Sequence, residues 1–117
     1  MPHLGDDVSA FLAHHVETFN AAVATGDFGP LVGLFAEEAS LEFAGVPVGP
    51  FEGRDAIAEA YAAQPPRDTM TVLDTRVAPD GTIVETFSWS ADDGVRSGEM
   101  RLTVDGGRIR RLVVVFG

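Results

Sequence analysis

The segment "FNAAVATGDFGPLVGLFAEEASLEF", residues 19–43, passes from helix to strand and decides the fold. Its first part ends a helix, because apolar residues recur every three to four positions over residues 6–25 and Gly26 is placed to stop the helix there. Pro30 suits the first turn of a second, short helix. The residues that this second helix is expected to bury are Leu31, Leu34 and Phe35. The final "SLEF" indicates a short strand.

The rest of the chain predicts a third helix and an antiparallel sheet. The helix covers about residues 54–64 and is stopped by Pro65 and Pro66. Turn-like "APDG", "ADDGV" and "DGG" separate four strand-like runs, at residues 69–77, 82–90, 97–104 and 108–116. This order of elements is typical of an α+β protein. A strongly bent sheet with helices on one face would leave an apolar pocket, which is a common ligand site.

Composition excludes several kinds of function. The chain has 117 residues, 45% apolar and 22% charged, which suits a single globular domain over residues 1–117. A net charge of −10 opposes binding to nucleic acid. The absence of cysteine, of a secretory signal and of a membrane-length apolar run leads us to expect a cytoplasmic protein with no membrane partner. We expect no metal, because the three histidines lack a spaced acidic partner, and no cofactor, because no glycine-rich phosphate loop is present.

Three segments carry a family resemblance: "FNAAVATGDFGPLVGLFAEEASLEF", "FEGRDAIAEAY" and the closing "VVVFG". With the four strands they cover nearly the whole chain, which resembles the nuclear-transport-factor-2-like superfamily, in its ketosteroid isomerase and SnoaL-like polyketide cyclase branch. The resemblance implies a cone-shaped, cystatin-like fold with three N-terminal helices packed on a strongly curved antiparallel sheet. It also implies that Glu37 and Glu38 are the exposed end of the second helix, and that the protein is a homodimer through the outer sheet face. Val113 and Val115 would supply the apolar centre of that interface.

The catalytic groups that this resemblance implies are not in place. Ketosteroid isomerases use a tyrosine, an aspartate base and a protonated aspartic acid. The positions that match the tyrosine and the base hold Phe19 and Phe43. The third acid falls on Glu99 if no gap is assumed, but on Met100 if the "VDGGR" turn has lost one residue. We favour Met100 facing the pocket with Leu102, because burying Glu99 and Arg101 in their place would cost more.

Glu85 is the leading candidate for acid–base chemistry. In "TIVETFSWS" it shares a strand face with Ile83, Phe87 and Trp89. A glutamate among aromatic side chains would be desolvated, so its pKa would rise and it could act as a general base or acid near neutral pH. The alternative is a more open face on which Glu85 forms an ion pair with a neighbouring arginine such as Arg111.

His15 and Tyr61 are the other candidates. His15 lies in the apolar stripe of the first helix, one turn before Phe19, and histidine titrates in the useful range. Its alternative role is that of a core-edge residue hydrogen-bonded to backbone. Tyr61 falls where the resemblance places a pocket tyrosine, and it could orient a ligand carbonyl. Its alternative role is packing, with the hydroxyl in solvent.

Three functions stay open, so the sequence does not decide whether the protein is an enzyme. The first is proton transfer on an apolar, steroid- or polyketide-like substrate in an isomerisation or cyclisation, with Glu85, Tyr61 and His15 as the catalytic set. The second is epoxide opening by the carboxylates of Glu85 and Glu99 with Arg101. The third is small-molecule binding without chemistry. The expected pocket residues are Phe19, Phe35, Phe43, Phe87, Trp89, Met100 and Leu102.

Overall fold

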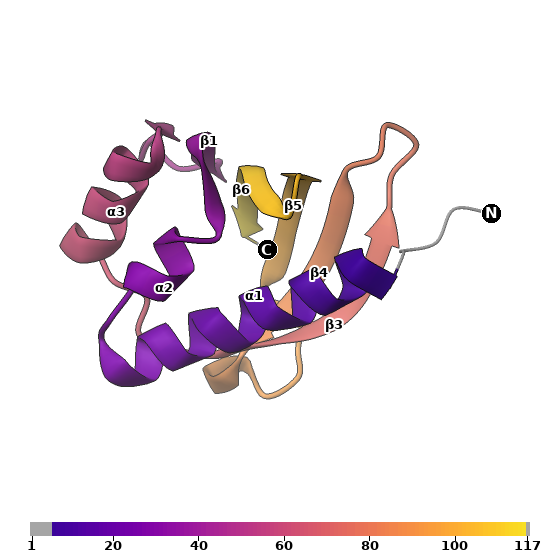
Figure 1. Ribbon diagram of the computed structural model, residues 1–117. Helices are drawn as coiled ribbons and strands as arrows, with labels where there is room; N and C mark the ends of the chain where they lie inside the picture. Colours follow the sequence, from indigo (N-terminus) through magenta and orange to yellow (C-terminus); the bar gives the residue numbers. More distant parts are fainter. Residues whose placement is uncertain (1–5, 117) are drawn as a thin grey trace.

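The computed structural model describes residues 6–116 (Figure 1). Its helices are α1 (Asp6–Thr25), α2 (Gly29–Val32) and α3 (Arg54–Ala63), with a single 3₁₀ turn at Ser90–Asp92. Its strands are β1 (Phe35–Ala44), β2 (Phe51–Glu52), β3 (Met70–Val77), β4 (Ile83–Trp89), β5 (Gly98–Asp105) and β6 (Arg108–Phe116). The three predicted helices and the four predicted C-terminal strands are all present.

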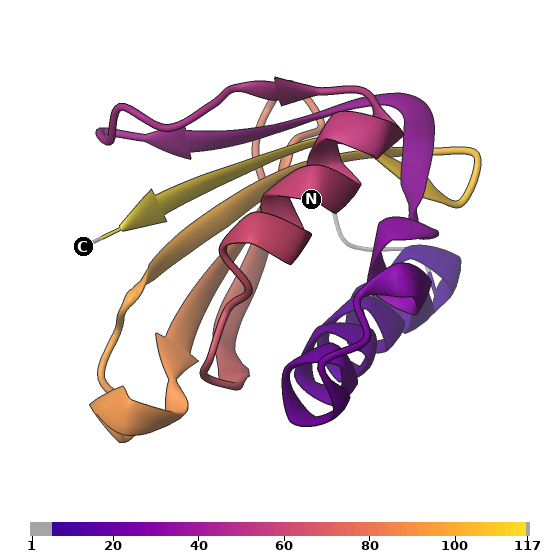
Figure 2. The ribbon, with the colours of Figure 1, turned by 90° about the vertical axis from the view of Figure 1, so that its left-hand side faces the viewer.

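The strands form one sheet in the order β2-β1-β6-β5-β4-β3. β3 to β6 make the predicted antiparallel meander, and β1 joins it by pairing in parallel with β6. The sheet is bent, and α1 and α3 lie on the same side of it (Figure 2). The architecture is therefore the expected α+β arrangement of helices packed on a curved sheet.

The segment after α2 differs from the prediction. α2 ends at Val32, and β1 begins at Phe35, so Glu37 and Glu38 are exposed strand residues and not the end of a helix. The strand forms because Phe35 and Ala39, both 0% exposed, are buried in the core and β1 pairs with β6. The register between β1 and β6 shifts between Phe35 and Ser40, which marks a bulge at the acidic residues.

The C-terminal half of α1 is fixed by its stop residue and by a contact with the sheet. Gly26 adopts φ +81°, a conformation open to glycine, and its N–H donates to the Ala22 carbonyl at 2.7 Å, so the helix stops there as predicted. The Asn20 side chain makes two hydrogen bonds to the backbone of Met70, of 3.0 and 2.9 Å. These bonds tie the C-terminal half of α1 to the start of β3.

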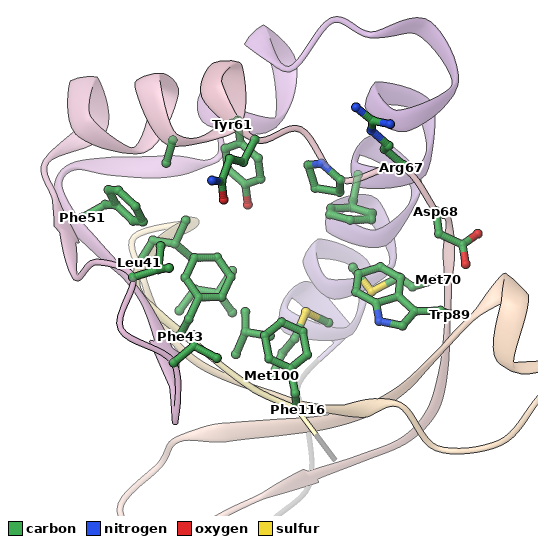
Figure 3. A pocket seen from close by; sticks show the side chains of 18 of the residues that line it. Leu41, Phe43, Phe51, Tyr61, Arg67, Asp68, Met70, Trp89, Met100 and Phe116 are labelled. Carbon is green, nitrogen blue, oxygen red and sulfur yellow. The ribbon is translucent and has the colours of Figure 1, made fainter.

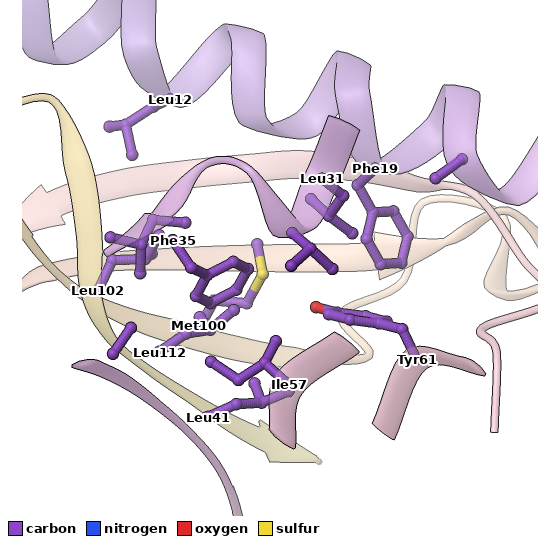
Figure 4. Close-up of a cluster of buried hydrophobic side chains, with 14 of the residues drawn as sticks. Leu12, Phe19, Leu31, Phe35, Leu41, Ile57, Tyr61, Met100, Leu102 and Leu112 are labelled. Atoms are coloured by element: carbon purple, nitrogen blue, oxygen red, sulfur yellow. The ribbon is translucent and has the colours of Figure 1, made fainter. Parts of the chain in front are cut away.

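The core is built from buried apolar side chains of all three helices and of the sheet (Figure 4). Its fully buried members include Leu31, Phe35, Ile57, Leu102 and Ile109, each 0% exposed. Beyond this core the helices and sheet separate around a cavity. None of the helices in the described part of the chain is long and apolar enough to cross a membrane.

Candidate functional site

A cavity of about 850 Å³ lies between the concave face of the sheet and the helices (Figure 3). Its size falls within the roughly 300–1,000 Å³ of small-molecule sites. Most of its lining is apolar or aromatic. The apolar lining residues from α1 and the strands are Phe19, Leu41, Phe43, Phe51, Met70, Phe87, Trp89, Met100, Leu112, Val114 and Phe116.

Five of the seven predicted pocket residues line this cavity: Phe19, Phe43, Phe87, Trp89 and Met100. Phe35 and Leu102 do not line it, so the prediction that they are pocket residues is wrong. Both side chains are 0% exposed and belong to the core, where Leu102 pairs with Ile83 and Leu112. Strand alternation identified the correct face, but it does not tell how far along the face a cavity extends.

The two orientations of β5 are now resolved. Met100 lines the cavity and Leu102 faces inward, as favoured. Glu99 lies on the outer face, where Arg76, Arg96 and Arg101 approach its carboxylate at 3.5, 3.6 and 3.3 Å. The Glu99 and Arg101 pair is therefore outside the cavity and not available for epoxide opening there.

On β1, as on β5, the apolar residue faces the cavity and the adjacent charged residue faces outward. Phe43 lines the cavity, and Glu42 forms an ion pair with Arg111 at 3.1 Å. Arg111 is thus engaged by Glu42, so its suggested pairing with Glu85 is wrong. The three positions at which the resemblance implies isomerase groups, Phe19, Phe43 and Met100, are all apolar residues that line the cavity.

Glu85 is buried, with only 2% of the residue exposed. It does not line the cavity itself, but shares the inner face of the sheet with two residues that do: Phe87, two positions further along β4, and Met100, its partner on β5. Its Oε1 is fully buried, and no residue in the described part of the chain donates a hydrogen bond to it. Burial raises the pKa of this carboxyl from 4.5 to about 7. Near neutral pH, Glu85 can therefore hold or release a proton.

His15 lines the cavity from α1 and is 1% exposed. Neither ring nitrogen has a hydrogen-bond partner among the described residues, so the alternative of a backbone-bonded histidine is wrong. Burial, with a smaller contribution from His14, lowers the pKa of His15 from 6.5 to about 4. At pH 7 its imidazole is neutral and offers one donor and one acceptor nitrogen.

Tyr61 lines the cavity from α3, whereas His15 lines it from α1. Its ring stacks on Phe28, with centroids 5.4 Å apart and planes inclined by 8°. The residue is 8% exposed, and burial raises the pKa of its phenol above the usual value. The hydroxyl points toward the cavity, and no described residue hydrogen-bonds to it (Figure 3). It is therefore free to donate a hydrogen bond to a ligand.

The rim of the cavity was not predicted. One side is apolar and partly exposed, with Val46, Val48 and Phe116 at 41%, 40% and 48% exposure. The other side carries charge, and its members include Arg67 and Asp68 (Figure 3). These residues lie in loops or at a strand end, where no periodic pattern marks them. Within residues 6–116, no group of three histidine, cysteine, aspartate or glutamate side chains is arranged to hold a metal ion.

Comparisons with known proteins agree with this geometry. The model of the SnoaL-like domain family matches residues 16–112. No curated protein matches the sequence. Among solved structures, one named "Putative Isomerase from Bacillus subtilis" is 18% identical, with a TM-score of 0.72 and coverage of 97% of this chain and 90% of that chain.

Two further structures are similar. The epoxide hydrolase/cyclase-like enzyme SalBIII, which has a role in pyran ring formation in the polyether salinomycin, is 20% identical with a TM-score of 0.72, covering 93% and 89% of the two chains. A "putative polyketide cyclase" from Sinorhizobium meliloti is 23% identical with a TM-score of 0.60, covering 86% and 93%. At these identities the likeness establishes the fold.

Proposed function

Because the chain belongs to the SnoaL-like domain family, we propose that it acts on an apolar small molecule by proton transfer, in an isomerisation or a cyclisation. One observation carries this proposal: an apolar cavity is lined by two polar groups without a partner in the described chain, the buried His15 ring and the Tyr61 hydroxyl that points into the cavity (Figure 3). Buried polar groups are normally hydrogen-bonded, so unpaired ones that face a cavity suit the polar atoms of a ligand.

The chemical class of the substrate follows from the walls. Their aromatic and aliphatic side chains favour a rigid apolar body of the size of a steroid or a polycyclic polyketide. The structural neighbours that are named as an isomerase and a polyketide cyclase support the same class. The unpaired Tyr61 hydroxyl favours a carbonyl oxygen at the inner end of the substrate.

In the proposed reaction, Glu85 removes a proton from the carbon next to the carbonyl. The C–H electron pair moves to the carbonyl oxygen and forms an enolate, and Glu85 becomes a neutral acid. The Tyr61 hydroxyl donates a hydrogen bond to that oxygen, and the neutral His15 ring assists beside it. Where the substrate is a β,γ-unsaturated ketone, the enolate is conjugated with the C=C bond, and return of the proton from Glu85 to the γ carbon moves the double bond and completes an isomerisation. Met100 pairs with Glu85 across the sheet and lines the cavity, and its unbranched side chain has the freedom to turn aside and admit the substrate to Glu85.

The test uses a polycyclic α,β-unsaturated ketone in deuterated buffer. Binding is followed by the fluorescence of Trp89, the single tryptophan, which lines the cavity. Exchange of the protons next to the carbonyl is followed by mass spectrometry. We expect exchange that rises as the pH passes through about 7, where Glu85 ionises. Glu85→Gln should retain binding and lose exchange by about 100-fold or more, and Glu99→Gln on the outer face should retain both. Equal exchange in the wild type and Glu85→Gln would remove Glu85 from the reaction.

A specific observation favours a second candidate, which is binding without chemistry. All three positions that the resemblance assigns to isomerase groups, Phe19, Phe43 and Met100, are apolar cavity residues. A protein that only holds its ligand would quench Trp89 fluorescence on binding and show no proton exchange above the buffer rate. This result would favour the second candidate over the first.

A further inference from the structure

We propose that the ligand of this cavity is an anion, an apolar keto acid whose carboxylate is bound by Arg67 at the rim. This inference rests on the proposed small-molecule function and adds the charge of the ligand and the residue that recognises it. Arg67 is an exposed lining residue of the cavity, and the lining also includes the half-buried Asp68 and Trp89 (Figure 3). No sequence pattern had marked it.

Arg67 is the arginine without a partner in the described chain. All eight basic residues of the protein are arginines, and all eight lie within the described part. Seven of them bind a carboxylate or a backbone carbonyl. These are Arg54 with the Phe35 carbonyl, Arg76, Arg96 and Arg101 with Glu99, Arg108 with the Gly33 carbonyl, Arg110 with Glu38 and Asp105, and Arg111 with Glu42. In a chain with 18 acidic residues, a guanidinium that meets none of them is available to a ligand.

The backbone holds Arg67 in place while its side chain stays free. Two prolines, Pro65 and Pro66, precede it and restrict the chain. The Asp68 carboxylate accepts a hydrogen bond from the Ala91 N–H at 2.9 Å, and the Thr69 carbonyl accepts one from the Ser90 N–H at 2.9 Å. The rim position is therefore ordered before any ligand arrives, which reduces the entropy lost on binding.

The rim is the place at which an anion would be stabilised. His15 is neutral at pH 7, and no arginine besides Arg67 lines the cavity, so a carboxylate in the interior would be desolvated without a counter-charge. At the rim the same carboxylate would keep water on one side and meet the planar guanidinium, whose geometry suits two parallel hydrogen bonds. The ligand would enter with its apolar, carbonyl-bearing end first.

The acidic residues of the rim act against this anion only weakly. Asp68 accepts from Ala91, and Asp92 accepts a hydrogen bond from the Ser97 hydroxyl, so two of these carboxylates already have donors. Glu59 on α3 is exposed. Repulsion between solvated charges is screened beyond about 8 Å at physiological salt, whereas the contact with Arg67 acts at hydrogen-bond distance. The direct contact is expected to dominate the affinity.

The test compares two probes with one skeleton: 3-oxo-4-androstene-17β-carboxylic acid and its neutral methyl ester. Their dissociation constants are measured by Trp89 fluorescence at pH 7.5 for the wild type, Arg67→Gln and Arg101→Gln. Arg67→Gln should weaken the acid about fivefold, the upper range for an exposed ion pair, and leave the ester within about twofold. Arg101→Gln makes the same change in net charge on the outer face and should alter neither probe. Its ion pair with Glu99 is replaced in part by Arg76 and Arg96.

The outcomes separate this inference from the function that it rests on. If both probes bind the wild type and Arg67→Gln weakens both equally or neither, the anion assignment is overturned while the small-molecule function stands. If Arg67→Gln and Arg101→Gln weaken the acid alike, the effect is net charge and the role of Arg67 is again overturned. If neither probe changes the Trp89 fluorescence of the wild type up to its solubility limit, the proposed substrate class fails, and the anion inference fails with it.

Discussion

Replacing Glu85 or His15 by glutamine should change how stability depends on pH, and the two replacements should act in opposite directions. Both groups are buried, at 2% and 1% exposure, and neither has a hydrogen-bond partner in the described chain for its buried polar atoms. Burial favours the neutral form of each. It therefore raises the pKa of the acid and lowers the pKa of the base.

The magnitudes follow from the two pKa shifts. The pKa of Glu85 rises from 4.5 to about 7. As the pH rises between these values, the unfolded chain loses this proton first, so the free energy of unfolding falls by about 1.4 kcal/mol per pH unit, about 3 kcal/mol in total. The pKa of His15 falls from 6.5 to about 4. As the pH drops between those values the unfolded chain gains a proton that the folded chain does not, so stability falls by a similar amount in the opposite direction.

The two effects overlap between about pH 4.5 and 6.5, where they should cancel in the wild type. Glu85→Gln exposes the His15 effect, so its stability relative to wild type should rise by about 3 kcal/mol across these two pH units. His15→Gln exposes the Glu85 effect, and its relative stability should fall by the same amount. The double variant should follow the wild type across this window.

Urea unfolding at half-unit steps from pH 4.5 to 8, followed by Trp89 fluorescence and circular dichroism, measures these slopes. Differences between each variant and the wild type remove the contribution of the other titrating residues, which the net charge of −10 makes large. Parallel curves for the wild type and Glu85→Gln would mean that Glu85 titrates as an exposed acid. That result would refute both the burial argument and the assignment of Glu85 as a base near neutral pH.

Three further outcomes are expected from packing. Leu102→Ala should lower the free energy of unfolding by about 3 kcal/mol in urea titrations, whereas Phe116→Ala, at a half-exposed rim position, should cost under about 1 kcal/mol; similar losses would contradict the division between core and rim. Gly98→Ala places a Cβ 2.2 Å from the Val115 carbonyl oxygen, so it should cost about 2 kcal/mol or more by separating β5 from β6, and a neutral result would contradict that contact. We propose a homodimer through the outer sheet face, and Val113→Asp should convert it to a monomer in analytical ultracentrifugation. If the variant keeps the mass of the wild type, the outer sheet face is not the dimer interface.

Strand alternation accounts for much of what the sequence predicted. Placing Met100 and Leu102 inward required the comparison of two ways to bury β5, and the apolar set is the one that the structure buries. The same rule separated Phe43 from Glu42 on β1. These predictions succeed because a strand that is solvated on one face has only two orientations, and their desolvation costs differ greatly.

The errors have physical causes as well. The helix end at Glu37 and Glu38 was implied by the family resemblance, and the helix-compatible residues Ala36 to Ala39 did not argue against it. The pairing of β1 with β6, distant in the sequence, outweighs that local preference. The absence of partners for His15 and Arg67 was equally inaccessible, because it depends on where every other side chain comes to rest.

The position of β6 has a consequence for how the protein is made. This strand follows every other described element in the chain, yet in the sheet it lies between β1 and β5. During translation, β1 with β2 and the hairpins of β3 to β5 therefore emerge as two pieces that lack their shared neighbour. Each piece presents an open edge that can pair with another nascent chain. A ribosome stalled before residue 108 would therefore hold a product prone to aggregate, until the last strand of the sheet joins the two pieces.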